Sequence, residues 1–75
     1  MTRVQLCINN EIVHSYQFYD LLDGLVYIYR NNIEFDTMYV NDDTIVRKCE
    51  FRRYLSTMNN FYKRMYGTCY EELGV

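Results

Sequence analysis

The stretch FRRYLSTMNNFYKRMY, residues 51–66, sorts two kinds of side chain onto opposite sides of one helix. At 100° per residue, the apolar side chains gather around the direction of Leu55. The expected core stripe consists of Phe51, Leu55, Met58, Phe61, Tyr62 and Met65. The opposite side carries four cations and no acid, namely Arg52, Arg53, Lys63 and Arg64, with Asn60 among them. We therefore expect an amphipathic helix over residues 48–66, with one buried face and one basic, solvated face.

The chain begins with two segments of period-2 alternation, which is typical of half-buried strands. Their apolar positions are Val4, Leu6 and Ile8 in the first segment and Ile12, His14, Tyr16 and Phe18 in the second. A three-residue loop at Asn9, Asn10 and Glu11 would pair Ile8 with Ile12 and keep both apolar sets on one face. The sequence thus predicts a β-hairpin over residues 2–18.

Residues 20–32 predict the first helix, with Leu21, Leu25 and Ile28 as its apolar stripe. Asp20 can cap the start by accepting a hydrogen bond from the amide of Asp23, and Asn31 or Asn32 can end the helix. Gly24, inside the helix, would let it approach the sheet closely. Tyr27 falls on the polar side, so we expect its ring to be exposed.

Two short segments join the helices. Residues 33–40 alternate with Ile33, Phe35 and Tyr39 on one face and predict a third strand, and residues 41–43 supply a turn. Residues 44–46 lie off the core stripe of the long helix, so we expect an extended segment and a helix start near Lys48. Gly67 suits the left-handed position after a helix, and the spacing of Thr68 and Glu71 predicts a short helical turn through Leu73.

These elements define an α+β fold in one compact domain over residues 1–75. The expected order is ββαβ(β)α plus a short C-terminal helical turn. A small, mostly antiparallel sheet of three or four strands, with both helices packed on one face, would bury the apolar stripes.

Composition and cysteine count narrow the class of protein. Hydrophobic residues make up 49% of the chain, with nine tyrosines and four phenylalanines, which indicates a globular domain rich in aromatic surface. The three cysteines, Cys7, Cys49 and Cys69, are widely spaced and odd in number, so we expect a reduced, cytosolic protein without a disulfide framework. No segment resembles a signal peptide or a membrane span, and no ligand spacing indicates a metal site or a cofactor.

The charge is segregated along the chain. Residues 1–43 hold seven acids and two cations, whereas residues 44–66 hold six cations and one acid, and the whole chain has a net charge of −2. The protein is therefore expected to be dipolar, with its basic pole on the long helix.

Three groups of residues are candidates for binding a partner. The basic group consists of Arg52, Arg53, Lys63 and Arg64 with Asn60, the aromatic one of Tyr27, and the acidic one of Asp36, Asp42 and Asp43. The basic group is read as a phosphate-tracking face, as a contact for an acidic protein surface, or as a solvated face that balances the acidic half. The acidic group is read as a mimic of nucleic-acid charge or as ordinary turn chemistry.

Nothing in the sequence indicates catalysis. His14 and a cysteine would need an orienting group and a cleft to form a nucleophilic site, and the three isolated glycines form no phosphate-binding loop. We therefore expect a protein that is not an enzyme.

In size and composition the chain is similar to the small inhibitor and effector proteins that phages and mobile elements direct against host proteins. The sequence thus favours a small cytosolic protein-binding module, an inhibitor or adaptor, which as a homodimer would also protect an exposed edge strand. The alternative function is nucleic-acid binding through the basic face of the helix at 48–66.

Overall fold

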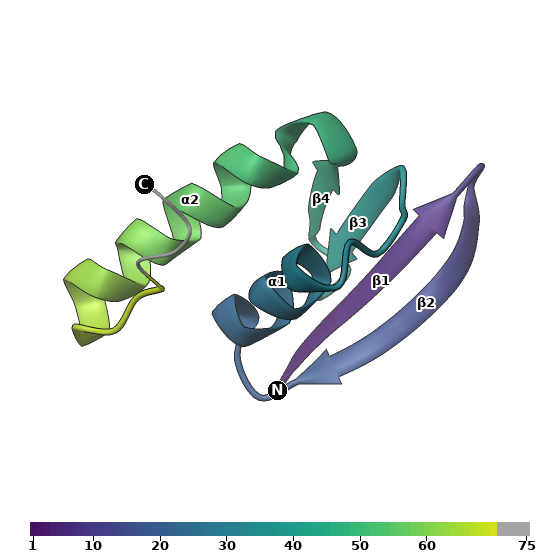
Figure 1. Ribbon diagram of the computed structural model, residues 1–75. Coiled ribbons are helices and arrows are strands. Elements are labelled where there is room, and N and C mark those ends of the chain that lie inside the picture. The colour runs from purple at the N-terminus through teal and green to yellow at the C-terminus, as the bar shows by residue number, and fades with distance from the viewer. Residues whose placement is uncertain (71–75) are drawn as a thin grey trace.

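The structure is a computed structural model that describes residues 1–70. The elements follow in the order ββαββα: β1 (Thr2–Ile8), β2 (Glu11–Phe18), α1 (Leu21–Arg30), β3 (Thr37–Val40), β4 (Thr44–Arg47) and α2 (Lys48–Tyr66) (Figure 1). The α+β fold is confirmed, with residues 44–47 forming a fourth strand. Residues 68–70 are not helical, and the rest of the predicted C-terminal turn lies outside the described residues.

The four strands form one antiparallel sheet in the order β2-β1-β3-β4. Helix α1 packs on β1 and β2, and α2 packs on β4 and on α1. Figure 1 shows α2 running away from β4, with its last turns beyond the strands. The first half of α2 therefore lies over the core, and the second half extends past it.

The hairpin forms as expected, but its register differs from the prediction. The turn has two residues, Asn9 and Asn10, with φ values of 53° and 67°. Two adjacent asparagines tolerate the left-handed conformation that a tight hairpin turn requires. Ile8 therefore pairs with Glu11, and the predicted pairing of Ile8 with Ile12 is wrong.

A bulge then shifts the register of β2. Ile12 pairs with Cys7 and His14 with Leu6, which leaves Val13 as the extra residue. Because a bulge changes the side of the sheet to which successive residues point, Ile12 shares the uncovered face with Cys7. His14, together with Tyr16 and Phe18 farther along, shares the helix-covered face with Leu6. The prediction that Ile12 and His14 lie on one face is therefore wrong.

The third strand is shorter than predicted and has the opposite phase. Residues 33–36 are irregular, and Met38 and Val40, not Tyr39, face the core. The phase changes at Asp36, whose amide donates to the Cys7 carbonyl (2.8 Å) and whose carbonyl accepts from the Lys48 amide (2.9 Å). Phe35 is buried before this junction, so simple alternation cannot continue through it.

Helix α1 matches its sequence signals. The Asp20 side chain accepts from the Asp23 amide (3.0 Å), and Asn31 is the C-cap. A Cβ at Gly24 would lie 2.4 Å from Cδ2 of Phe18, so the glycine lets α1 sit directly against this ring of β2. The fully buried core side chains, from β1, α1, β3 and α2, are Val4, Leu6, Leu25, Ile28, Met38 and Leu55.

Helix α2 begins at Lys48 and ends at Gly67, whose φ of 73° is left-handed, as predicted. Its core stripe differs in the second half. Phe51 and Leu55 are buried, but the stripe continues to Asn59, whereas Phe61 and Met65 are 43% and 58% exposed. The prediction that Phe61 and Met65 belong to the core is wrong, because both point to one side of the buried line of Phe51, Leu55 and Asn59. Tyr62, which points along that line, still packs against the core.

Candidate functional site

The second half of α2 exposes a group of apolar side chains that has two cations within it. Phe61, Met65 and Tyr66 are 43%, 58% and 65% exposed, and Lys63 and Arg64 lie between them in the chain. We call these five residues the distal surface of α2. Tyr62 links its aromatic members, with ring centroids 6.2 Å from Phe61 and 5.3 Å from Tyr66.

The returning chain after Gly67 holds this half of α2 in place. Asn59, almost fully buried, donates to the Tyr70 carbonyl (2.9 Å) and accepts from the Tyr70 amide (2.8 Å). The Tyr70 hydroxyl donates to the Asp23 carboxylate (2.9 Å), and the Arg30 guanidinium lies 5.3 Å from the ring centroid. The helix end that leaves the sheet is thus tied back to α1.

The same contact changes the acidity of Tyr70. The hydrogen bond to the Asp23 carboxylate, followed by burial, raises the pKa of the Tyr70 phenol above its ordinary value, against the opposing effect of Arg30. The hydroxyl therefore remains a proton donor at neutral pH.

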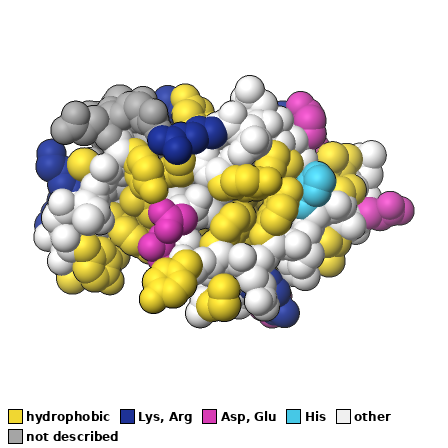
Figure 2. All heavy atoms as spheres, turned by 60° about the horizontal axis from the view of Figure 1, so that its bottom comes forward, with side chains coloured by type: hydrophobic (Ala, Val, Ile, Leu, Met, Phe, Trp, Pro, Cys, Tyr) yellow, Lys and Arg dark blue, Asp and Glu magenta, His cyan; other side chains and the backbone are white. Residues whose placement is uncertain are grey.

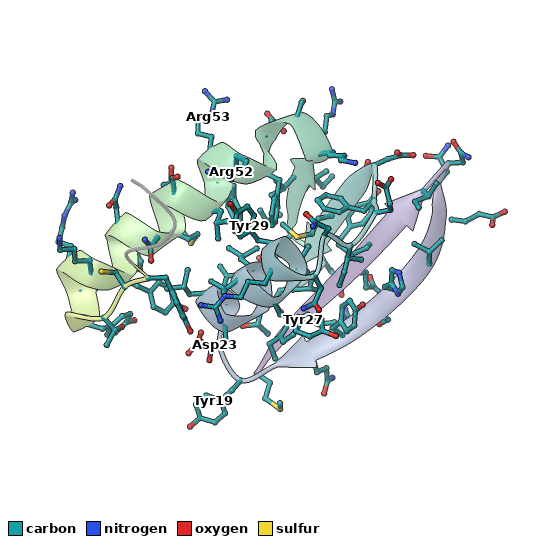
Figure 3. The ribbon with its side chains drawn as sticks, in the orientation of Figure 1. Tyr19, Asp23, Tyr27, Tyr29, Arg52 and Arg53 are labelled. Atoms are coloured by element: carbon teal, nitrogen blue, oxygen red, sulfur yellow. The ribbon has the colours of Figure 1, made fainter. Side chains whose placement is uncertain are left out.

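The basic candidates divide into two kinds. Arg52 donates to the Tyr29 hydroxyl (2.7 Å), and its guanidinium lies 4.7 Å from that ring centroid, so it serves as a contact between the helices. Arg53 points away from the body of the protein in Figure 3. Within residues 1–70, no ion pair involves Arg53, Lys63 or Arg64, and Asn60 is exposed on the same outward side of α2. The outward cations of α2 are therefore these three.

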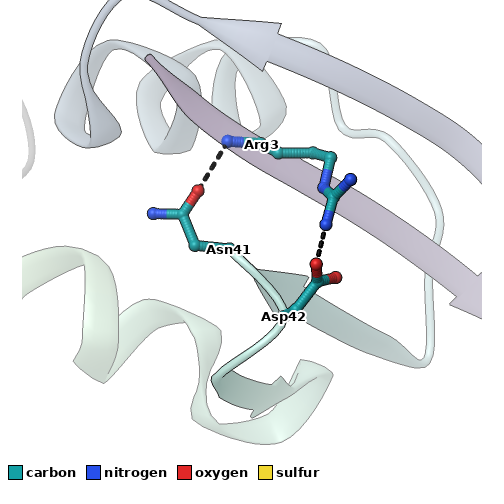
Figure 4. Close-up of polar contacts among 3 residues, drawn as sticks. All are labelled: Arg3, Asn41 and Asp42. Carbon is teal, nitrogen blue, oxygen red and sulfur yellow. Dashed lines mark hydrogen bonds and ion pairs between the residues drawn. The ribbon is translucent and has the colours of Figure 1, made fainter.

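The three acidic candidates contact the chain's own loops. Asp36 accepts from the Asn9 amide (2.9 Å), Asp43 accepts from the Thr44 hydroxyl (3.1 Å), and Asp42 pairs with Arg3. Figure 4 shows the last contact beside the bond from the Arg3 amide to the Asn41 side chain. These contacts support the interpretation of the acidic group as turn chemistry. Asp42 ties β1 to the loop between β3 and β4, Asp36 ties the β1–β2 turn to the segment before β3, and the contact of Asp43 is local.

An aromatic cluster lies where α1 crosses β2. Tyr27, 45% exposed as expected from its place on α1, contacts Tyr16 and Phe18 at 5.7 Å between ring centroids. His14 stacks on Tyr16 at 5.7 Å, and Figure 2 shows the histidine beside hydrophobic side chains. Burial, and secondarily Tyr27, raises the pKa of Tyr16.

Two exposed residues at the end of β2 were not among the sequence candidates. Tyr19 is 86% exposed and Met1 is 83% exposed, and they adjoin the paired residues Phe18 and Thr2. The sequence position of Tyr19 could have indicated its exposure. It stands between the last residue of β2 and the helix cap Asp20, so neither element buries it.

His14 and Cys7 do not form a site together. His14 pairs with Leu6 and therefore lies on the same side of the sheet as Leu6. Cys7 is the next residue of β1 and points to the opposite side, so His14 and Cys7 face away from each other. Cys7 is buried. No cluster of three or more histidine, cysteine or acidic residues suited to a metal ion occurs within residues 1–70.

A cleft next to the basic residues lies between the end of α1 and the start of α2. It has a volume of about 400 Å³ and is open to solvent, with Tyr29, Phe35 and Phe51 in its walls. Its cations are already engaged, because Lys48 approaches Glu34 (3.6 Å) and Arg52 bonds Tyr29. The cleft thus offers no convergent set of unpaired polar groups for a small ligand.

The chain matches no family model, no curated protein and no solved structure. Among the described helices, none is long and apolar enough to cross a membrane.

Proposed function

We propose that the protein is a binding module for another protein, acting as an inhibitor or adaptor through the distal surface of α2. The observation that supports the proposal is the exposure of Phe61, Met65 and Tyr66 on a helix end that the chain itself holds in place through Asn59 and Tyr70. Exposed apolar groups of this kind mark interaction sites in small soluble domains.

The chemistry of the surface defines the kind of partner. Phe61 and Met65 are four residues apart, so they lie on one side of the helix and can enter one hydrophobic groove. Arg64 lies next to them around the helix, Lys63 projects from another side of the same turns, and the stretch from 59 to 66 contains no acid. The partner that fits is a protein surface with an apolar groove and an acidic rim, because aromatic anchors give affinity and complementary charges give specificity.

The proposal also covers the compartment in which the protein acts and the kind of inhibitor that it is. Three free thiols favour action in the reducing cytosol. The small size and the tyrosine content favour an inhibitor of phage or mobile-element type, directed against a host protein and without an activity of its own.

The test compares proteins captured by immobilised wild type with those captured by Phe61→Asp/Met65→Asp. A matched control is Ile45→Asp, which places a new acid on an apolar residue of β4 that is 62% exposed. A partner of the proposed class is retained by the wild type and the control and lost from the double variant, with direct affinity weakened by about 30-fold or more, the scale of a hot spot. Retention by the double variant would show that the distal surface is not the site.

The alternative function is nucleic-acid binding, and one observation supports it. Arg53, Asn60 and Arg64 fall in one row on the outward side of α2, opposite the buried residues Phe51, Leu55 and Asn59. A phosphate-tracking row would bind DNA or RNA at about 50 mM salt and lose affinity steeply as salt rises. Binding to nucleic acid that Arg53→Glu/Arg64→Glu abolishes would favour this alternative over the protein partner.

A further inference from the structure

The two edges of the sheet are protected to different degrees. Edge strand β4 has four residues, ends in Arg47 and follows a turn that contains Asp42 and Asp43. Edge strand β2 has eight residues, and its one charged residue, Glu11, lies at the turn. Short length, charges and bulges are the usual protections of an edge, and β2 has only the bulge at Val13. Residues 14–18 therefore form a regular, uncharged, unprotected edge.

The backbone of this edge can be oriented from the neighbouring strands. The carbonyls of Arg3 and Cys7 accept from residues on the β3 side, namely the amides of Asn41 and Asp36. Peptide groups alternate in direction along a strand. The N–H and C=O groups of the even-numbered residues of β1 therefore point toward β2. Ser15 and Gln17 pair with the odd residues Gln5 and Arg3, so their own peptide groups point outward from the sheet.

Exposed apolar side chains accompany this backbone edge. Ile12 and Val13 of β2 are 58% and 43% exposed, and Tyr27 is 45% exposed beside the ring of Tyr16. Met1 and Tyr19, at the far end of the same hairpin, are more exposed still. Within residues 1–70, the outward peptide groups of this edge have no strand partner, and apolar surface lies above and below them.

We propose that a second copy of this chain pairs with β2 in antiparallel orientation, with Ser15 on the twofold axis. The axis at Ser15 brings the outward peptide groups of the two Ser15 residues together in a hydrogen-bonded pair. Gln17 then faces Val13 of the second copy, and Tyr16 faces His14. The two sheets become one continuous sheet of eight strands.

A second copy fits this edge by charge as well as by backbone geometry. In the register centred on Ser15, Glu11 lies opposite Tyr19 of the second copy, so the two Glu11 carboxylates stand at opposite ends of the interface. No like charges meet along residues 12–18, which contain no ionised acid, lysine or arginine. The aromatic clusters of the two copies become neighbours, which adds apolar burial to the backbone hydrogen bonds. The interface is separate from the distal surface of α2 and does not depend on the proposed function.

The experiment measures molar mass by light scattering at about 100 µM, a concentration at which a micromolar dimer is fully formed. The wild type is expected at twice the chain mass. Ser15→Pro removes one outward amide and leaves the pairing with β1 intact, because proline is tolerated on the outer side of an edge strand. This variant is expected at the mass of one chain, which at this concentration requires the dissociation constant of a micromolar dimer to rise by about 1,000-fold or more.

A matched control tests the other edge of the sheet. Ile45 pairs with Tyr39, which pairs in turn with Gln5, so the Ile45 amide points outward from β4 by the same alternation. Ile45→Pro is expected to remain dimeric. A monomeric wild type would overturn the proposal, and the β2 edge would then suit an extended segment of a different protein. A dimer that Ile45→Pro abolishes and Ser15→Pro preserves would place the interface on β4.

Disulfide crosslinking tests the same pairing if Ser15→Pro does not fold. In a background of Cys49→Ser and Cys69→Ser, Ser15→Cys places two thiols on the proposed axis, where paired Cα atoms lie about 5.5 Å apart, within reach of a disulfide. Added oxidant is expected to convert this variant to a crosslinked dimer and to leave Ile45→Cys in the same background uncrosslinked. Equal crosslinking of both variants, or of neither, contradicts the pairing through β2.

Discussion

The β2 edge and the distal surface of α2 both leave apolar side chains uncovered, and they differ in what surrounds those side chains. Along β2, Ile12 and Val13 accompany a row of outward peptide groups with almost no charge. On α2, Phe61 and Met65 stand on a helix whose peptide groups are satisfied internally, and the charges of that stretch, Lys63 and Arg64, are of one sign. The first surface suits its own copy, and the second suits an acidic partner.

The two surfaces are also held in place by different means. Phe18 of β2 packs directly against Gly24, so α1 fixes the aromatic cluster at the edge. The end of α2 has no strand beneath it and relies on Asn59 and Tyr70. Changes to each support should therefore disturb one surface and spare the other.

The largest expected effect separates the two halves of α2. Leu55→Ala removes a fully buried side chain and should lower the free energy of unfolding by about 2–5 kcal/mol. Met65→Ala, on the same predicted stripe, should change it by less than about 0.5 kcal/mol because its side chain is exposed. Urea unfolding followed by circular dichroism measures both. Similar losses for the two variants would mean that the end of α2 is buried after all.

The support of the distal surface is tested at Asn59. Asn59→Ala removes the donor and the acceptor that hold the Tyr70 backbone and should cost about 1–3 kcal/mol, as for other buried polar groups left without partners. Amide hydrogen exchange should rise for residues 60–70 and stay unchanged along β2. Asn60→Ala, an exposed neighbour, is the control and should have little effect.

The support of the β2 edge is tested at Gly24. Gly24→Ala would place a Cβ against the Phe18 ring, and this overpacking should outweigh the better helix propensity of alanine, for a net loss of about 1–2 kcal/mol. In a Phe18→Ala background the same substitution should instead stabilise the protein by up to about 1 kcal/mol. A double-mutant cycle of unfolding free energies measures the reversal, and equal effects in both backgrounds would refute the contact.

The smallest effect is the response to alkaline pH. The pKa values of Tyr16, Tyr54 and Tyr70 are raised, by burial in the first two and mainly by the hydrogen bond to Asp23 in the third. Groups with raised pKa values in the folded state contribute stability that is complete below the unfolded value and lost as pH rises through the folded one. Stability should therefore be level near pH 8 and fall above about pH 10. Tyr70→Phe should make the fall shallower, and an identical slope in this variant would contradict the Asp23 contact.

Much of the fold could be predicted because its signals are local. The Asp20 cap, the left-handed Gly67, the extended segment before Lys48 and the hairpin all follow from residue types at fixed spacings. The register of β2 could not be predicted, since alternation alone does not distinguish a two-residue turn with a bulge from a three-residue turn. The predicted phase of β3 was wrong because Asp36 interrupts the alternation, where its backbone forms hydrogen bonds with Cys7 and Lys48.

The candidate surfaces were harder to predict than the elements. Phe61 and Met65 lie at the margin of the apolar stripe on a helical wheel, where direction alone does not decide burial, so both residues were assigned to the core. Asn59 pointed toward the core on the same wheel and was overlooked because it is polar. Tyr27 was predicted correctly to be exposed, since it lies off the apolar stripe of α1 and its ring contacts rings at the edge strand β2.

If the two exposed surfaces act independently, one binding a second copy and the other a different protein, a variant of one surface leaves the other intact. Sedimentation velocity at about 100 µM on the wild type, Ser15→Pro and Phe61→Asp/Met65→Asp tests this independence most directly. We expect a dimer for the wild type and for the α2 double variant, and a monomer for Ser15→Pro. A monomeric wild type, or a dimer that the α2 double variant dissolves and Ser15→Pro preserves, would contradict it.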